Sequence, residues 1–443
     1  MSRDLLLEIG VEEVPSAPLY DAVTQLKTRA AAAFDGARLS YGTITTHGAP
    51  RRLALVVTEL AERQEDVSMR VKGPAVAAAF DTSGAPTKAA EGFARSRGIA
   101  VSDLIREVTD SGEYVFAQVE ETGKPTEEIL PELLATLIGD LDWAKSMRWG
   151  SGSVRFIRPV RWLVALFGSI VVPVRFAGVE ADRTTLGHRF LGGPAEIPYA
   201  GAYIETLCHA HVMADAGERA ELIRAQLDKA AAALGARPVV PEKTFAEVVN
   251  LVEYPTVGVG RFDDAFLSVP REIVEEAMES HQRYFPMEAA DGSLLPRFLV
   301  VHNGDPVRTD AIIAGHERVI RARLADAAFF VAEDRARPLE AYVHDLDTIV
   351  FHEKLGSLGN KVARIEVLAS ALASAVDAPA DEAAYAKRAA HLAKADLDRF
   401  AAGYPTDKLN AFVLPYLGDI ALAKNDAAAA AAHYRDALKR FPE

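Results

Sequence analysis

Two pairs of apolar segments, each joined by a short turn sequence, limit the fold more than any other feature of this chain. Residues 161–167 and 170–176 flank Gly168-Ser169, a two-residue link with glycine first, as in a type II′ hairpin turn. Residues 284–287 and 298–301 flank an Asp-Gly pair in a similar way. Hairpin strands pair antiparallel, whereas a doubly wound parallel sheet needs a helix between successive strands. We therefore expect an α+β fold and not a parallel doubly wound one.

The order of patterns along the chain predicts four regions. Residues 1–140 alternate strand and helix signals and should form an N-terminal mixed α/β region. Residues 141–308 hold both hairpins and should form a β-rich central region. Residues 309–383 have a helical pattern, and residues 384–443 are an Ala-rich helical tail. Within the first region, residues 66–100 are rich in Gly, Pro and Ala and predict a structured loop with short helices.

Two helical segments have recognisable ends or spacings. Asp215 can cap a helix that Gly235 can end, with apolar residues along one face between them. Residues 411–442 match the small-residue spacing of a tetratricopeptide unit, in which two antiparallel helices approach closely. With the degenerate partial unit that precedes it, this tail cannot bury a solenoid core, so we expect it to pack on something else or to fray.

Charge and cysteine content exclude several classes of protein. The 49 Lys and Arg residues against 63 Asp and Glu give a net charge of −14, so any nucleic-acid contact must come from a local basic patch. The single cysteine, Cys208, excludes an internal disulfide and a Cys-rich metal site. No signal-peptide core is visible, and no apolar stretch reaches the ~20 residues that span a bilayer. We expect a soluble, cytoplasmic chain.

One strip of the sequence contrasts with this acidic background. Residues 145–161 contain five basic residues and no acidic one, and aromatic residues are interleaved with them: Lys145, Arg148, Trp149, Arg155, Phe156, Arg158 and Arg161, followed by Trp162. Guanidinium groups bind phosphates and aromatic rings stack on unpaired bases, so the mixture is suited to RNA. The alternative is a solvated basic strand whose aromatic residues face the core.

Two smaller clusters combine imidazole, guanidinium and aromatic groups. His281-Gln-Arg-Tyr-Phe-Pro286 stands just before an expected strand, and Gly187-His-Arg-Phe190 is a shorter cluster of the same kind. Such groups could read base edges or a terminal adenosine. The alternative, given equal weight, is a buried polar network that braces a loop.

Other chemistry-bearing residues do not predict a catalytic or metal site. Cys208, His209 and His211 lie too close in sequence to point at one ion from a regular helix or strand. His344-Asp345 is the dipeptide of metal-dependent HD phosphohydrolases, but it is a single dipeptide in an acid-rich stretch. No phosphate-cradling glycine motif and no Gly-x-Ser-x-Gly elbow occurs. We expect no catalytic residue, metal or cofactor in this chain.

Many motifs in order resemble one family, the β subunit of the bacterial heterotetrameric glycyl-tRNA synthetase, over residues 1 to about 380. The resemblance rests on eleven segments: Leu5–Pro15, Ala49–Ala54, Lys72–Pro74, Ala79–Asp81, Pro86–Arg95, Met147–Gly150, Phe156–Val160, Gly187–Phe190, His281–Pro286, Arg321–Phe330 and Phe351–Gly356.

The resemblance implies a glycine–tRNA ligase in which a separate α subunit holds the catalytic core, ATP and Mg, within an α2β2 complex. The β subunit would bind tRNA(Gly) and the α subunit. The candidate tRNA-binding residues are Arg51, Arg52, Lys145, Arg148, Arg155, Arg158, Arg161, His188, Arg189, His281, Gln282, Arg283 and Tyr284.

The chain departs from the family near Lys394. Family members continue through an HD-like helical domain into an anticodon-binding-like domain, whereas here a truncated HD-like start gives way to the tetratricopeptide-like tail. An alternative function is therefore a catalytically silent β-like interaction protein that docks a partner through this tail. The HD-like domain follows the Phe351–Gly356 motif, so His344-Asp345 comes too early to be its metal pair.

Overall fold

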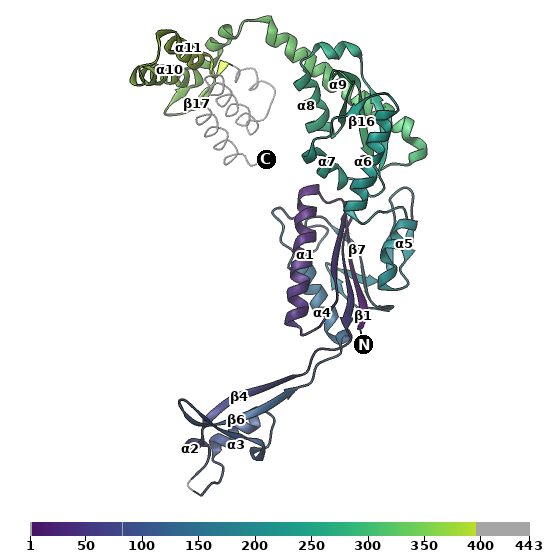
Figure 1. The fold of residues 1–443 in the computed structure, drawn as a ribbon, viewed down its shortest axis with the longest axis vertical. Coiled ribbons are helices and arrows are strands. Elements are labelled where there is room, and N and C mark those ends of the chain that lie inside the picture. Colours follow the sequence, from purple (N-terminus) through teal and green to yellow (C-terminus); the bar gives the residue numbers. More distant parts are fainter. Residues whose placement is uncertain (1, 82, 396–443) are drawn as a thin grey trace. The chain divides into compact units, whose positions relative to one another are not determined.

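The computed structural model describes residues 2–81 and 83–395, and the chain divides into two units at Arg323 and Leu324 (Figure 1). The tetratricopeptide-like segment at residues 411–442 lies outside the described residues. None of the helices in the described ranges is long and apolar enough to cross a membrane.

The first unit is built on one large sheet with strand order β2-β3-β1-β7-β10-β9. Its central strand, β1 (Ser2–Val11), pairs antiparallel with both β3 (Arg52–Ala61) and β7 (Val160–Phe167). The outer strands are β2 (Ile44–Ala49), β10 (Val179–Asp182) and β9 (Arg175–Phe176), and only the β10–β7 pair is parallel within this sheet. The α+β prediction is confirmed.

The sheet is covered on both faces, which explains why its strands are nearly continuous apolar runs. Leu5 and Leu7 pack with helices α1 (Ser16–Gly36) and α4 (Thr126–Gly139). Leu6 points to the other face and packs with Tyr203 and Leu207 of α5 (Tyr203–His209). Figure 1 shows α1 and α5 on opposite sides of the sheet. Because β1 pairs with β7, the expected boundary at residue 140 does not separate two sheets.

The predicted hairpin at Gly168-Ser169 is present but shorter than expected. Gly168 has φ +61°, the conformation that a type II′ turn needs at its first position, and β7 continues into β8 (Ile170–Val171). Pro173 has no N–H to donate, and the chain leaves this ladder and pairs through β9 with β10 instead. The expected single strand over 170–176 is therefore two short ones.

A second sheet, with order β13-β15-β16-β14, confirms the other hairpin. Strands β15 (Phe285–Glu288) and β16 (Leu294–His302) are antiparallel, and β13 (Arg237–Pro238) and β14 (Thr256–Arg261) flank them. Helix α6 (Ala216–Ala232) packs on this sheet together with α7 (Glu242–Val249), and α8 (Arg271–Gln282) precedes β15. As predicted, the Asp215 side chain caps α6, accepting from the Glu218 N–H at 3.0 Å. A separate pair, β11 (Thr184–Leu186) and β12 (Pro194–Glu196), precedes this sheet.

An insert between β3 and α4 forms a third sheet, with order β4-β6-β5. Its strands are β4 (Val67–Ala75), β5 (Ile105–Thr109) and β6 (Gly112–Glu121), and its helices are α2 (Val76–Ala79) and α3 (Lys88–Ser96). The short helices are confirmed, but residues 67–75 are a strand and not a loop. The strand forms because β6, distant in sequence, supplies its partners.

Helix α9 (Thr309–Ala336) crosses from the first unit into the second, and α10 (Leu358–Ala375) and α11 (Ala380–Leu392) follow. The helical pattern over 309–383 is thus confirmed, apart from a small hairpin of β17 (Val350–His352) and β18 (Gly356–Ser357).

Candidate nucleic-acid interface

The basic strip forms a closed loop between α4 and β7. The backbones of Met147 and Phe156 exchange hydrogen bonds of 2.8 and 3.2 Å, which hold the two ends of the loop together. Lys145, Arg148 and Arg155 are exposed on this loop. The structure therefore presents these three cations to solvent.

The aromatic residues of the strip serve the core instead. Phe156 is 1% exposed and packs edge-on against Trp143 at a centroid distance of 4.9 Å, and Trp162 is 8% exposed. Neither ring can stack on a base without unpacking the core, so for the aromatic residues the second interpretation of the strip is correct. Exposed aromatic rings occur further along the chain, at Phe190 (70%) and Tyr199 (53%).

The fold brings carboxylates to a strip that has none in its sequence. Glu12, just beyond β1, lies 3.3 Å from Arg161 Nε and 3.1 Å from Arg189 Nη2. Arg158 Nε donates to the backbone oxygen of Glu13 at 2.9 Å. Three of the predicted basic residues are thus partly engaged within the protein.

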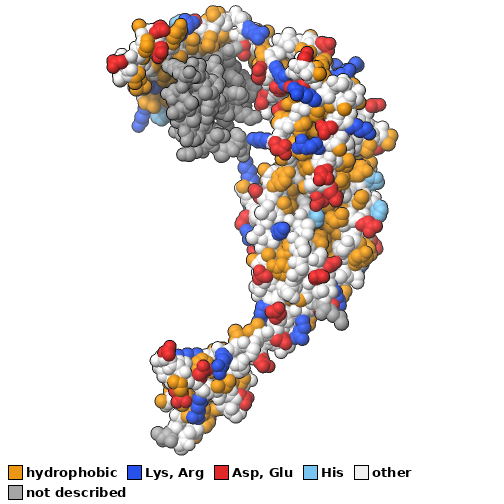
Figure 2. Space-filling model, in the orientation of Figure 1, with side chains coloured by type: hydrophobic (Ala, Val, Ile, Leu, Met, Phe, Trp, Pro, Cys, Tyr) orange, Lys and Arg blue, Asp and Glu red, His pale blue; other side chains and the backbone are white. Residues whose placement is uncertain are grey.

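The remaining cations keep their charge uncompensated. Lys145 and Arg148 make no ion pair or hydrogen bond with any residue that the structure describes, and Arg155 donates only to the hydroxyl and carbonyl of Ser146, at 3.0 and 2.8 Å. On the face shown in Figure 2, Lys/Arg and Asp/Glu side chains are interspersed. A small group of free cations, and not a broad basic face, is what this loop offers to a polyanion.

Arg52 is buried in the main sheet and makes no surface at all. Its guanidinium donates to Glu8 Oε1 at 2.9 Å, lies 3.0 Å from Glu253 Oε1 and donates to the Leu186 carbonyl at 2.7 Å. The Thr185 hydroxyl and Trp162 Nε1 also donate to Glu8 Oε1, at 2.8 and 3.0 Å. This buried network joins β1, β3, β7 and β11 to the loop before β14, and we withdraw Arg52 from the RNA surface.

The two kinds of ionisable group in this network respond differently to burial. Burial raises the pKa of the Glu8 carboxyl, against the opposing effects of Arg52 and of its two hydrogen-bond donors. Burial also disfavours the charged form of Arg52, but Glu253 and Glu8 outweigh it and raise the pKa of that guanidinium. Arg52 is therefore a fixed cation that pairs with both Glu8 and Glu253 inside the protein.

Sequence reasoning missed Glu8 and Glu253 as functional partners. A charged residue within an apolar strand run, as Glu8 is between Leu7 and Ile9, was the available signal for a buried pair. Arg51, next to Arg52, is 9% exposed, and its Nη1 lies 3.6 Å from Glu253 Oε2. Burial lowers the pKa of Arg51.

The cluster at residues 187–190 is a loop brace with an exposed tip. His188 is buried; its Nδ1 accepts from the N–H groups of Phe190 and Leu191, both at 3.3 Å, so its Nε2 carries the hydrogen and donates to Asn303 Oδ1 at 3.0 Å. Arg189 and Phe190 are exposed on the same loop. His188 therefore positions its neighbours and has no surface for RNA.

The cluster at residues 281–284 is also tied to internal partners. Arg283 Nη2 and Nε donate to Glu247 Oε1 at 2.8 and 3.0 Å. Tyr284 is buried, stacks on Phe298 at 4.6 Å and places its hydroxyl 2.8 Å from His316 Nδ1. Burial raises the pKa of Tyr284 to about 12. His281, Gln282 and Arg283 are partly exposed and stay on the candidate surface, although Arg283 is already ion-paired.

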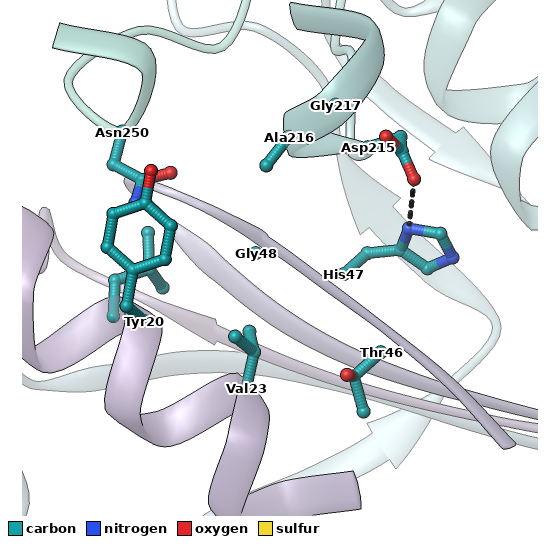
Figure 3. A pocket seen from close by; sticks show the side chains of 10 residues that line it. Tyr20, Val23, Thr46, His47, Gly48, Asp215, Ala216, Gly217 and Asn250 are labelled. Carbon is teal, nitrogen blue, oxygen red and sulfur yellow. Dashed lines mark ion pairs between the residues drawn. The ribbon is translucent and has the colours of Figure 1, made fainter. Parts of the chain in front are cut away.

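A cavity of about 150 Å³ lies between α1, β2 and the start of α6 (Figure 3). Tyr20, Asn250 and His47 line it, and His47 Nδ1 lies 3.4 Å from Asp215 Oδ2. Its volume is well below the ~300–1,000 Å³ of typical small-molecule sites, so it does not fit a nucleotide. None of the candidate RNA-binding residues lines it.

The side chains considered for metals lie apart or have other partners. Asp345 lies 3.0 Å from Arg337 Nη2, and Cys208 is exposed. Over residues 2–81 and 83–395, no group of three or more His, Cys, Asp or Glu side chains is placed to hold a metal ion.

Comparison with known proteins decides the family. The family model described as glycyl-tRNA synthetase beta subunit matches residues 5–399. The chain belongs to this family. The match ends at residue 399, close to Lys394, where we expected the chain to depart from the family.

Relatives named "Glycine--tRNA ligase beta subunit" cover the same region. The protein of Moorella thermoacetica is 47% identical over 398 residues, which is 90% of this chain and 57% of that protein. The protein of Bacillus subtilis is 43% identical over 395 residues, 89% of this chain and 58% of that protein. The chain thus matches a little over half the length of these relatives.

Proposed function

We propose that this family member acts as the β subunit of glycine–tRNA ligase, supporting the ATP-dependent attachment of glycine to tRNA(Gly) in the cytoplasm. The observation that carries the proposal is the family match over residues 5–399, which spans both units of the described structure. The relatives' names supply the reaction and imply an α-subunit partner.

We assign catalysis, ATP and Mg to the α subunit, and tRNA and α-subunit binding to this chain. The assignment follows the family resemblance stated above. Its direct test is ATP–pyrophosphate exchange with glycine: we expect none from the purified chain and robust exchange after the α subunit is added. Exchange by the chain alone would overturn the division of labour.

We place the main tRNA contact on Lys145, Arg148 and Arg155. These side chains are exposed and have no carboxylate partner within residues 2–81 and 83–395, so phosphate groups can approach them without displacing an ion pair there. Arg161 and Arg189, which share Glu12, are the next candidates, together with the exposed Phe190. Arg51, Arg158, His281, Gln282 and Arg283 are secondary candidates.

The test is co-purification with the α subunit, determination of the subunit ratio, and glycine charging of tRNA. Replacing Lys145, Arg148 and Arg155 together with Gln should weaken tRNA binding. It should also reduce the salt slope, the steepness of log affinity against log salt concentration, by about two to three units. Arg175→Gln, an equally exposed arginine that pairs with Glu180 at 3.1 Å, is the control and should change neither. An unchanged slope in the triple variant would place the RNA surface elsewhere.

A further inference from the structure

The insert sheet has one covered and one open face. Helices α2 and α3 cover the side on which Ala79, Ala90 and Val115 form a small core. Side chains alternate along a strand, so Val115 and Ala117 of β6 face the helices, whereas Tyr114 and Phe116 face away. Both of these rings are partly exposed.

The strand register places cations beside these rings. Lys72 of β4 is directly opposite Phe116, and Arg70 is opposite Gln118, so all four side chains share the open face. The ammonium of Lys72 lies 3.5 Å from the centre of the Tyr114 ring, and the Arg70 guanidinium lies 5.8 Å from that of Phe116. Two aromatic rings on neighbouring same-face positions are thus flanked by two exposed cations.

The carboxylates of this face leave one cation available. Glu107 of β5, opposite Tyr114, lies 3.0 Å from Arg70 Nη1. Among the described residues, Lys72 Nζ donates only to the Ser111 hydroxyl, at 3.3 Å. Glu120 also falls on this face, two residues beyond Gln118 along β6. The charge density is therefore modest, and stacking on the rings must supply most of any affinity.

The small core of the insert does not use these rings. The core of the insert forms on the other face, where Phe80 and Phe93 pack with Val115. An open antiparallel sheet with aromatic side chains two residues apart and cations beside them is suited to unpaired bases, because each ring offers a platform and each cation can contact a phosphate. Residues two apart on a strand are separated by about 7 Å, so the two platforms are neighbours.

We propose that the open face of the insert, formed by Arg70, Lys72, Tyr114 and Phe116, binds unpaired nucleotides of an RNA. This site is separate in sequence from the loop at residues 145–155. The identification of that RNA as tRNA rests on the proposed function; the chemistry of the site does not.

The test replaces the rings while keeping their apolar bulk. Tyr114→Leu with Phe116→Leu in the full chain should weaken binding of a fluorescent single-stranded RNA of about ten nucleotides by tenfold or more. Binding of an RNA duplex of equal length should change little. Circular dichroism and the urea midpoint show whether the insert stays folded.

A second variant tests the cations independently of the rings. Arg70→Gln with Lys72→Gln should reduce the slope of log affinity against log salt concentration for the single strand by about 0.7 units, the contribution of the one available cation, Lys72. The matched control is Arg106→Gln, which removes an exposed cation from the opposite face of the same sheet, where Arg106 lies 4.0 Å above Phe80. The control should leave affinity and slope within about twofold of the wild type.

Unchanged single-strand affinity in both double variants would overturn this inference. So would loss of α-subunit binding with RNA affinity intact, which would make the face a protein interface. If the wild-type complex charges no tRNA, the proposed function fails, while the short-RNA measurement still decides the role of the insert.

Discussion

The central sheet and the insert sheet treat the same residue types in opposite ways. In the central sheet both faces are covered, and Arg52 is held by Glu8 and Glu253 with no exposed surface. In the insert one face is open, and Lys72 rests on an aromatic ring with its charge still available. Whether one or both faces of a sheet are covered decides whether a cation on its strand stabilises the fold or is available to bind a ligand.

The largest effect should come from removing the cation of the central sheet. Arg52→Ala leaves Glu8 and Glu253 buried without their cation, and we expect a loss of about 3–5 kcal/mol in the free energy of unfolding. Urea denaturation measures it. Arg161→Ala, which breaks the exposed pair with Glu12, should cost less than about 1 kcal/mol. Equal losses would contradict the distinction between the two environments.

The next largest effects should come from glycine-to-alanine substitutions, which should change stability in opposite directions in the two parts of the molecule. A Cβ on Gly10 would lie 1.9 Å from the Trp162 ring, so Gly10→Ala must displace a core aromatic residue and should cost about 2–3 kcal/mol. A Cβ on Gly92, in α3 of the insert, would meet nothing within 4 Å. Gly92→Ala should therefore stabilise the insert by about 0.5–1 kcal/mol. Thermal unfolding of both variants checks the opposite signs.

The smallest effect concerns Glu279, an acid with no cationic partner in the described part of the chain. Burial, together with Glu275 and Glu276, raises the pKa of Glu279 in α8 to about 7. A raised folded-state pKa gives stability that is full below the unfolded value of about 4.5 and is lost as pH rises through about 7. Allowing for solvent screening, Glu279→Gln should be about 1 kcal/mol more stable than the wild type at pH 8 and equal to it near pH 4.5. Urea midpoints of both proteins at the two pH values measure this difference. A difference that is the same at both pH values would contradict the raised pKa of Glu279.

Local signals in the sequence were sufficient for the elements with short-range partners. Gly168-Ser169 specified a tight turn, and Asp215 specified the start of α6, because turns and caps depend on a few adjacent residues. The β4 strand was missed because its partner β6 is distant in sequence and its own residues, such as Ser68 and Arg70, are not strongly apolar.

The candidate site could be predicted only in part for a related reason. The free cations Lys145, Arg148 and Arg155 were visible as a run without acids. That Glu12 and Glu13 would meet Arg161, Arg189 and Arg158 depends on β1 lying beside β7, which no local pattern encodes. Burial of Arg52 follows from the same pairing, because both faces of the sheet are covered.

The position of β1 at the middle of its sheet also sets the order in which the chain can fold. Its partner β3 comes early in the sequence, before the insert. Strand β7 emerges from the ribosome only after the whole insert and α4 have been made. Until then the apolar Leu5, Leu6 and Leu7 lie on an unpaired strand edge, the kind of surface that associates with other chains. The insert, whose strand pairs all lie within residues 67–121, has no such delay. We therefore expect the insert to fold before the central sheet is closed, and the long-range β1–β7 pairing to form more slowly than the local strand pairs of the insert.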